Sequence, residues 1–274
     1  EGMPTLLTTL ARTVMIGVLQ LTTSCVPEPI EWDTPRAVPD TLRATTSLTI
    51  TVDGSPRLVE ERVPSLTLPS GACGASLVAT RARSGEWYAA WFVPRPNSGV
   101  ALAVAHSTDD GATWGAPVIV DDRDRGRRGC QRPPPALVAS AVSDYVHVAY
   151  YLEPPQGAGV WYTHSMDRGH VWHQTIGVLY GDAPARTSVA SAGDTVIVAY
   201  EHPGAPGRRL GLAISRQAGH TFDAHLRVVH GSSWVGNPRV AIQRGVVALA
   251  WSERPAEPSS SAVRLTRLMK GRLR

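Results

Sequence analysis

The chain has 274 residues, of which 43% are hydrophobic and 18% are charged. This length and composition allow a sizeable hydrophobic core and exclude an intrinsically disordered chain. The formal net charge is +4, and Lys270 is the only lysine among the 27 basic residues. Neither a basic helix nor a nucleic-acid-binding motif accompanies this charge, so we expect no nucleic-acid partner. The 25 glycines and 22 prolines indicate many turns and an all-β domain.

The first apolar segment lies near the start of the chain. Residues 13–24 are uncharged and follow Arg12, which is the pattern of an export signal or short anchor. The run is shorter than the about 20 residues of a membrane-spanning helix. Cys25 follows in the sequence LTTSC, which resembles a bacterial lipobox, although Thr22 stands where that pattern prefers an aliphatic residue. Three alternatives stay open for residues 1–25: a lipoprotein signal with lipidation at Cys25, a cleaved export signal, or a retained hydrophobic anchor helix.

The flanking charge predicts that the rest of the chain lies at the extracytoplasmic, periplasmic face of a bacterial membrane, tethered by the N-terminal segment or by a lipid on Cys25. Residues 26–45 hold four prolines and show little hydrophobic periodicity. This composition predicts an extended, semi-rigid spacer before the next domain.

The remaining sequence, residues 46–274, is repetitive. Aromatic residues at the end of β-branched runs recur about every 50 to 60 residues, at Trp91, Tyr150, Tyr200 and Trp251. Short apolar runs separated by glycine, serine and aspartate predict four strands in each unit. Four strands per repeat of about 50 residues are typical of a propeller blade. We expect four or five blades, with residues 47–52 supplying the outer strand that completes the fourth.

A short motif, S-x-D-x-G-x-x-W, follows the third predicted strand of the first two units. The third unit keeps the serine, the glycine and an aromatic residue but has Gln217 in place of the aspartate. The motif residues are Ser107, Asp109, Gly111 and Trp114, then Ser165, Asp167, Gly169 and Trp172, then Ser215, Gly219 and Phe222. We interpret them as structural, because the carboxylate can bind turn N–H groups, glycine accepts a positive φ, and the aromatic ring can be buried against the neighbouring blade. The amide of Gln217 is expected to accept one such bond.

These motifs resemble the Asp boxes of the sialidase-like β-propeller superfamily, over about residues 70–270. The resemblance implies a small all-β propeller of four-stranded blades whose Asp boxes lie away from the active site. It also implies a catalytic set of three arginines for a substrate carboxylate, a tyrosine nucleophile paired with a glutamate, and an aspartate acid/base.

The candidates for the three arginines are Arg132, Arg186 and Arg239, each just before the first strand of a blade, where it would face the channel mouth. Their registers differ, and the early Arg-Ile-Pro segment of the family has no counterpart here. Tyr200 and Glu201 are neighbours on one strand, so their side chains face opposite sides and do not form the nucleophile pair. The catalytic set is therefore incomplete.

Two further groups of residues are candidates for a disulfide and for a calcium site. Cys73 and Cys130 each precede the first strand of a blade, so they lie on the same face of the ring and are predicted to form a disulfide, which an exported protein allows. Residues 121–126 have calcium-like spacing, but the interleaved arginines oppose a cation, so we expect a solvated loop.

Three histidines, His164, His170 and His173, surround the second Asp box. We interpret them as exposed turn residues rather than zinc ligands, and we expect neither a metal nor a cofactor.

The leading expectation is a non-catalytic, membrane-tethered scaffold, not an enzyme, that binds the subunits of a larger membrane complex, such as a respiratory or photosynthetic one, through the propeller surface. Residues 123–132 and 264–274 are arginine-rich candidate contact surfaces. The alternative is an exported sialidase-type glycoside hydrolase or sugar-binding module. A weaker alternative is an assembly factor for a membrane complex.

Overall fold

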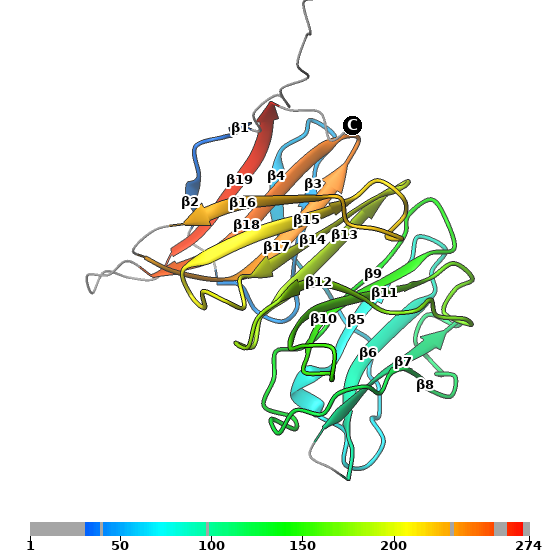
Figure 1. Ribbon diagram of the computed structural model, residues 1–274. Coiled ribbons are helices and arrows are strands. Elements are labelled where there is room, and N and C mark those ends of the chain that lie inside the picture. The colour runs from blue at the N-terminus through cyan, green and yellow to red at the C-terminus, as the bar shows by residue number, and fades with distance from the viewer. Residues whose placement is uncertain (1–30, 39–40, 97–98, 231–232, 255–261, 271–274) are drawn as a thin grey trace, which may run out of the picture.

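The computed structural model describes residues 31–38, 41–96, 99–230, 233–254 and 262–270 (Figure 1). Within these ranges the regular structure is β apart from one 3₁₀ turn, η1 (Gly74–Ser76). The strands form five antiparallel sheets, and no closed barrel forms among them. The all-β class predicted from the sequence is therefore confirmed.

Four of the sheets are blades that follow one another in chain order. The first holds β5 (Val78–Arg81), β6 (Trp87–Pro94), β7 (Val100–Ser107) and β8 (Val118–Asp121). The second holds β9 (Ala136–Ala139), β10 (Val146–Leu152), β11 (Gly159–Ser165) and β12 (Ile176–Tyr180). The third holds β13 (Thr187–Ala192), β14 (Thr195–Glu201), β15 (Arg209–Ser215) and β16 (Ala224–His230). The fourth holds β17 (Trp234–Gln243), β18 (Val246–Arg254) and β19 (Ala262–Lys270), with two N-terminal strands described below.

The middle strands of each blade are buried on both faces because each blade is packed between its neighbours. Every residue of β10 and β11 is buried, whereas the outer strand β12 is partly exposed. Strands buried on both faces have continuous apolar sequences rather than an alternating pattern. This explains the unbroken apolar and aromatic run of β10.

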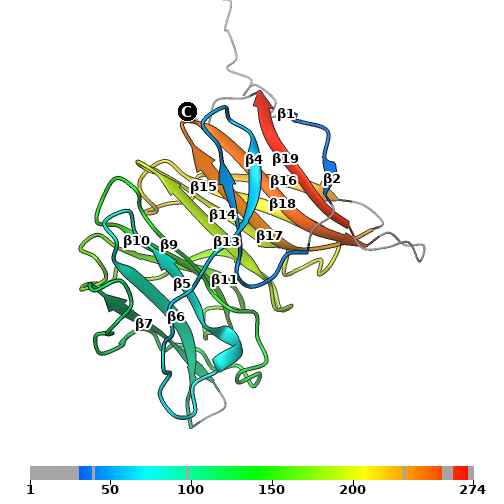
Figure 2. The ribbon, with the colours of Figure 1, turned by 180° about the vertical axis from the view of Figure 1, so that it is seen from behind.

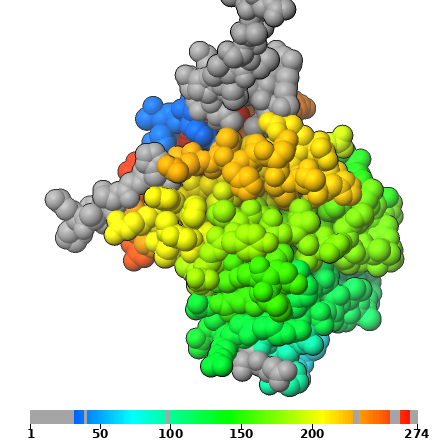
Figure 3. All heavy atoms as spheres, viewed as in Figure 1, coloured from blue at the N-terminus to red at the C-terminus, as the bar shows by residue number. Residues whose placement is uncertain are grey.

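Three hydrophobic clusters join the blades in pairs. Phe92 of the first blade packs with Tyr150 of the second, and Tyr162 of the second packs with Val198 of the third. The third and fourth blades share a cluster that includes Trp251. In the space-filling view the blades succeed one another in chain order without a break (Figure 3).

Two short N-terminal strands, β1 (Glu31–Trp32) and β2 (Arg36–Val38), pair with β19 and supply the outer edge of the fourth blade. Both lie within the segment expected to be a spacer. The expected donor, residues 47–52, has another role. Among the described residues its strand β3 (Thr46–Ile50) pairs with β4 (Pro56–Glu60) alone, and this hairpin lies beside the fourth blade (Figure 2). Leu48 and Ile50 of the hairpin pack against that blade. The prediction that residues 47–52 complete the fourth blade is therefore wrong.

The stretch after the hairpin covers the free side of the first blade. Leu66 and Leu68 pack against Trp91 on that side, and Pro64 lies against Gly111. One continuous N-terminal stretch therefore covers both ends of the stack of blades. The predicted hydrophobic helix of residues 1–25 and the lipidation site Cys25 lie outside the described residues. Within the described ranges, no helix has the length and apolar character needed to cross a membrane.

Candidate functional site

The antiparallel meander of each blade places its connections at two opposite ends. Turns between the first and second strands lie at one end together with the Asp boxes, which join the third and fourth strands. We call this end the Asp-box face. Connections between the second and third strands, and from each blade to the next, lie at the other end, which we call the loop face.

The two complete Asp boxes share two hydrogen bonds to the aspartate carboxylate. In the first box, the Asp109 carboxylate accepts bonds from the backbone N–H of Thr113 and the hydroxyl of Ser107, both at 2.8 Å. In the second box, Asp167 accepts the equivalent bonds from Val171 at 2.8 Å and from Ser165 at 2.7 Å. Bonds of this kind stabilise the ionised form. The Thr113 hydroxyl, which donates to Asp109 at 2.6 Å, and then the Thr113 N–H and the Ser107 hydroxyl lower the pKa of Asp109 to about 2.

The box glycines have a positive φ and lie against the preceding structural unit. Gly169 has φ +85° and faces Tyr88 of the first blade, and Gly219 has φ +91° and faces the Tyr162 hydroxyl of the second. The aromatic residues also pack towards the preceding blade, since Phe222 meets Tyr162 edge-on with ring centroids 5.0 Å apart. Trp114 and Trp172 join the clusters on the outer side of the first blade and between the first two blades. The Asp boxes thus have a structural role: they form the turns and pack each blade against the preceding unit.

The third box differs at Gln217. Ser215 still accepts the N–H of Gly219 at 3.0 Å, as the first serine does for Gly111. Within the described ranges, however, the Gln217 side chain makes no hydrogen bond, and only its backbone takes part. The expected amide contact is therefore not formed.

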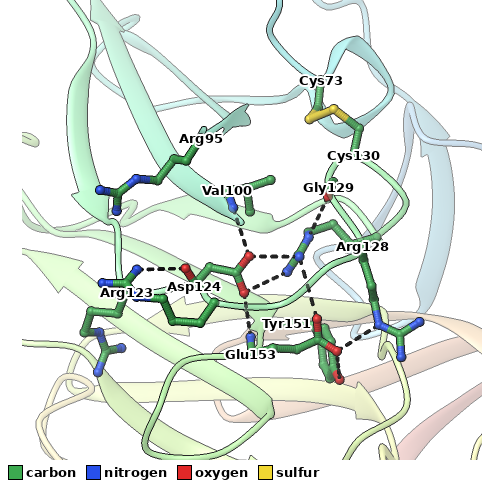
Figure 4. Close-up of polar contacts among 12 residues, drawn as sticks. Cys73, Arg95, Val100, Arg123, Asp124, Arg128, Gly129, Cys130, Tyr151 and Glu153 are labelled. Atoms are coloured by element: carbon green, nitrogen blue, oxygen red, sulfur yellow. Dashed lines mark hydrogen bonds and ion pairs between the residues drawn. A yellow bond between two sulfur atoms is a disulfide. The ribbon is translucent and has the colours of Figure 1, made fainter. Parts of the chain in front are cut away.

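The loop face is organised by a buried ion pair between Asp124 and Arg132. The two side chains are 0% exposed, and the guanidinium Nη2 lies 2.9 Å from the carboxylate Oδ2. The same carboxylate accepts the backbone N–H of Val100 in the first blade and of Glu153 in the second, both at 2.9 Å (Figure 4). A buried charge is tolerated only when paired and hydrogen-bonded in this way. Asp124 therefore fastens the loop after β8 to two blades.

The disulfide lies beside this clamp. The structure joins Cys73 to Cys130, the pair that the sequence predicts, with Cα atoms 5.3 Å apart (Figure 4). Arg132 also donates from Nε to the carbonyl oxygen of Gly129 at 2.9 Å. The loop between the first two blades is thus fixed at both ends, by a covalent bond and by a buried ion pair.

Glu153 extends the clamp towards the surface. Its Oε1 accepts a bond from Arg128 Nε at 2.9 Å, and its Oε2 lies 3.8 Å from the Arg132 guanidinium. The Tyr151 hydroxyl donates to the carbonyl oxygen of Asp182 at 2.8 Å and lies 3.4 Å from Glu153 Oε1. Burial, and then the Glu153 charge, raise the pKa of Tyr151 to about 12, so this phenol stays protonated at neutral pH.

Residues 121–126 are not a simple solvated loop, contrary to expectation. Asp121 is 4% exposed and accepts the Tyr150 hydroxyl at 2.9 Å and the Arg123 guanidinium at 2.8 Å. Arg123 in turn lies over the ring of Trp161, with 4.6 Å from its guanidinium carbon to the ring centroid. Asp121 and Asp124 bury their charges in arginine pairs, a partnership that the sequence pattern alone did not reveal.

Two arginines of the loop after β8 are available to a ligand. Arg125 and Arg127 are exposed. Across the described residues, neither has an acidic partner, although Arg125 donates to the backbone carbonyl oxygens of Asp122 and Asp124. The loop face also carries an exposed aromatic ring, because Tyr180 is 56% exposed and packs edge-on against Trp161.

The three candidate arginines do not form one group: Arg132 stands apart, whereas Arg186 lies close enough for its charge to help lower the pKa of Arg239. Arg132 is enclosed by its ion pair, as described above. Arg239 donates to the backbone carbonyl oxygens of Thr46 and Arg43, both at 2.8 Å, and burial lowers its pKa. Arg186 is exposed; its backbone N–H donates to the Glu201 carboxylate at 3.0 Å, and its carbonyl oxygen accepts the Glu201 N–H at 3.0 Å. Two of the three guanidinium groups are thus committed to the fold, and no shared carboxylate site is formed by the trio.

A cleft lies on the opposite, Asp-box face between the first two blades. Its lining includes Tyr88, Glu86 and Asp144, and its volume is about 170 Å³. Arg168 bridges this cleft, since its guanidinium lies 2.9 Å from Asp144 and 3.5 Å from Glu86. The volume is below the roughly 300 Å³ of the smallest usual ligand sites. The loop face is therefore the stronger candidate.

Comparison with known proteins adds information on the fold. No family model and no curated protein matches the chain. A solved protein of unknown function from Dyadobacter fermentans has a TM-score of 0.50 and 16% identity, over 70% of this chain and 52% of that one. A Hadza microbial sialidase gives 0.46 and 17%, over 72% and 46%, and an α-L-arabinofuranosidase from Podospora anserina gives 0.44 and 12%, over 74% and 66%. The chain spans about half the length of the first two.

These comparisons correct one expectation. The chain was expected not to be an enzyme, yet the similar structures whose names state an activity are sialidases and other glycoside hydrolases. The incomplete arginine trio is therefore no ground for excluding catalysis. At these identities the likeness concerns the fold alone, and the described residues have the four-stranded antiparallel blades that the Asp-box repeats predict.

Proposed function

We propose that the loop face recognises an anionic carbohydrate, as a glycan-binding or glycoside-hydrolysing propeller module. The observation that carries this proposal is the pair of exposed arginines, Arg125 and Arg127, on a loop fixed by the buried pair of Asp124 and Arg132. A guanidinium group presents a planar fork of donors that suits a carboxylate or sulfate. Because its loop is already ordered, little conformational entropy is lost on binding.

The neighbouring aromatic surface supports a sugar rather than a simple ion as ligand. Tyr180 exposes an amphipathic ring beside the arginines' loop, next to Trp161 and Arg123. Such a ring can cover the apolar face of a sugar while its hydroxyl stays in water. An anionic sugar would meet both a charged and an apolar contact.

The disulfide supports the further proposal that the propeller works outside the cytoplasm. Disulfides persist in oxidising compartments and are rare in the cytosol. Trapping of free thiols in intact cells tests this, since a reduced Cys73 and Cys130 would contradict an extracytoplasmic location. The expected role as a membrane-bound scaffold subunit and the weaker role in assembly stay predictions.

Calorimetric titration with sialyllactose and with an oligogalacturonate, using lactose as the neutral control, tests the carbohydrate proposal. We expect an anionic glycan to bind and lactose to bind much more weakly. The double variant Arg125→Ala/Arg127→Ala should weaken binding at least about 10-fold, because each lost charged hydrogen bond is worth roughly 1.5–3 kcal/mol.

The matched control is Arg83→Ala/Arg244→Ala, which removes two exposed arginines from turns of the Asp-box face. It should bind like the wild type. Equal loss in both double variants, or no binding of either anionic glycan, would contradict the proposal. A fluorogenic sialoside in parallel separates turnover from binding alone.

A further inference from the structure

Three histidines from two neighbouring blades converge on the Asp-box face. His164 is on β11, His173 follows the second Asp box, and His220 belongs to the third. One ring nitrogen of each histidine lies within 4.8 Å of a ring nitrogen of each of the other two. In the sequence His170 stands with His164 and His173 around the second Asp box, but the structure places His220 of the next blade beside those two instead.

The three histidine rings contact one another, one pair stacked and the third ring edge-on. His164 and His173 are stacked with centroids 4.5 Å apart and an interplanar angle of 13°. His220 meets them edge-on, at 4.7 Å from His164 and 5.3 Å from His173. Because an imidazole lone pair lies in the plane of its ring, the exposed His173 ring must turn out of the stack for both nitrogens to face one ion.

His164 carries the strongest indication of a ligand. The residue is 3% exposed, in contrast to the exposed His173 and His220 and to the expectation that all these histidines are exposed. Its buried Nε2 has no hydrogen-bond partner among the described residues. Buried polar atoms are nearly always paired, so this nitrogen is free to accept a bound group.

The backbone holds two of the three histidines in register. The N–H of His173 donates to the carbonyl oxygen of His164 at 2.9 Å, and the Thr163 hydroxyl donates to the carbonyl oxygen of His173 at 2.7 Å. His220 is held by its own turn, where its N–H donates to the Gln217 carbonyl oxygen at 2.9 Å. The side chains therefore extend from positioned backbone.

We propose that His164, His173 and His220 bind a divalent transition-metal ion, with Zn²⁺ as the chemical class that fits best. Imidazole nitrogens bind Zn²⁺ at about 2.0–2.1 Å, which in a tetrahedron separates two ligand nitrogens by roughly 3.4 Å. The exposed side chains of His173 and His220 can rotate to close the remaining distance. Water completes the fourth position, because the site opens to solvent.

The metal would join the second blade to the third at the box that has lost its aspartate. The third box lacks the carboxylate that orders the other two, and His220 lies within it. A metal bridge from His220 to His164 would replace that order. Since such an ion binds the folded state, it raises the melting temperature.

The test uses tag-free protein stripped with a chelator and titrated with Zn²⁺, and then with Co²⁺, whose visible absorption reports tetrahedral coordination. We expect one ion per chain and a Zn²⁺-dependent rise in melting temperature. His173→Ala and His220→Ala alter exposed residues that should not prevent folding. Each should weaken binding by more than the about 10- to 100-fold that loss of an outer-shell partner costs.

His170→Ala is the matched control, since His170 is an exposed histidine of the second Asp box outside the cluster. It should bind Zn²⁺ like the wild type. The proposal is overturned if the stripped protein takes up no Zn²⁺, if His173→Ala and His220→Ala bind as tightly as the wild type, or if His170→Ala loses binding equally.

Discussion

The two ends of the blades are built on different principles. On the Asp-box face, a short motif recurs with the same backbone bonds, the same positive φ and the same packing on the preceding unit. On the loop face, the connections differ from blade to blade, and the one after β8 is fixed by a buried ion pair and a disulfide. The comparison teaches that repetition specifies the architecture, whereas the unique loop holds the candidate site.

The largest effect is expected at the loop-face clamp. Arg132→Ala leaves the Asp124 carboxylate buried without its cation and should lower the free energy of unfolding by about 3–5 kcal/mol. Arg128→Ala removes an ion pair of similar length, 2.9 Å, from an arginine that is 41% exposed. This control should cost at most about 1 kcal/mol. Denaturant unfolding measures both, and equal small losses would show that the buried pair does not fix the loop.

The disulfide should rank next. Cys73→Ser with Cys130→Ser opens a link across 57 residues and should cost about 2–4 kcal/mol, mainly by freeing the unfolded chain. A melting curve of the double variant, compared with that of the wild type under reducing and non-reducing conditions, measures this. If the reductant lowers the melting temperature of the double variant as much as that of the wild type, the stabilisation comes from elsewhere.

On the Asp-box face, adding a single methyl group to a box glycine should destabilise the fold. Gly219→Ala forces an alanine to φ +91° and places its Cβ against the Tyr162 hydroxyl, at a cost of about 1–3 kcal/mol. Gly74→Ala is the control, because Gly74 has no positive φ and no neighbour within 4 Å of a built Cβ. Chemical denaturation that finds the two variants equal would contradict a backbone role for the box glycine.

Restoring the third box should give a smaller gain. Gln217→Asp supplies the carboxylate that accepts a turn N–H in the other two boxes and should stabilise the fold by roughly 1 kcal/mol. Asp167→Gln makes the reverse change in the second box and should cost a similar amount. Thermal unfolding of the pair sharpens the comparison, and a destabilised Gln217→Asp variant would show that the third box follows other rules.

The smallest effect is the acid response of the first box. The folded pKa of Asp109, about 2, is below its ordinary value of 3.8. A depressed carboxylate pKa contributes stability that is complete above the unfolded value and is lost as the pH falls through the folded value. Asp109→Asn should flatten the loss of stability between roughly pH 4 and 2. An unchanged acid limb would indicate that these hydrogen bonds do not stabilise the ionised form.

Local motifs carried the part of the fold that could be predicted from the sequence. The spacing of Asp109, Gly111 and Trp114 is short enough to specify its own turn, and it fixes the blade around it. The outer strand of the fourth blade was misplaced because β1 pairs with β19, more than 200 residues away, and such pairing has no local signature. Residues 47–52 have the same strand pattern whether they join β19 or form a hairpin.

The candidate site was harder to predict, because burial decides which arginine side chains can contact a ligand. Arg132 and Arg186 look alike in sequence, yet one is enclosed by Asp124 and the other is exposed. The alternation of Asp and Arg in residues 121–128 was the signal for paired charges. That alternation could not show which arginines have no acidic partner and stay exposed. His220 belongs to a different repeat from His164 and His173, so a search for local metal motifs around the second Asp box does not include it.

Hydrogen-exchange mass spectrometry with and without a saturating anionic glycan tests the central claim most directly. We expect bound glycan to slow exchange in the loop of residues 122–132 and beside Tyr180, while the Asp-box turns exchange as before. The same glycan should give no protection in Arg125→Ala/Arg127→Ala. Protection confined to the Asp-box turns, or equal protection of both faces by the neutral lactose, would contradict recognition of an anionic carbohydrate at the loop face.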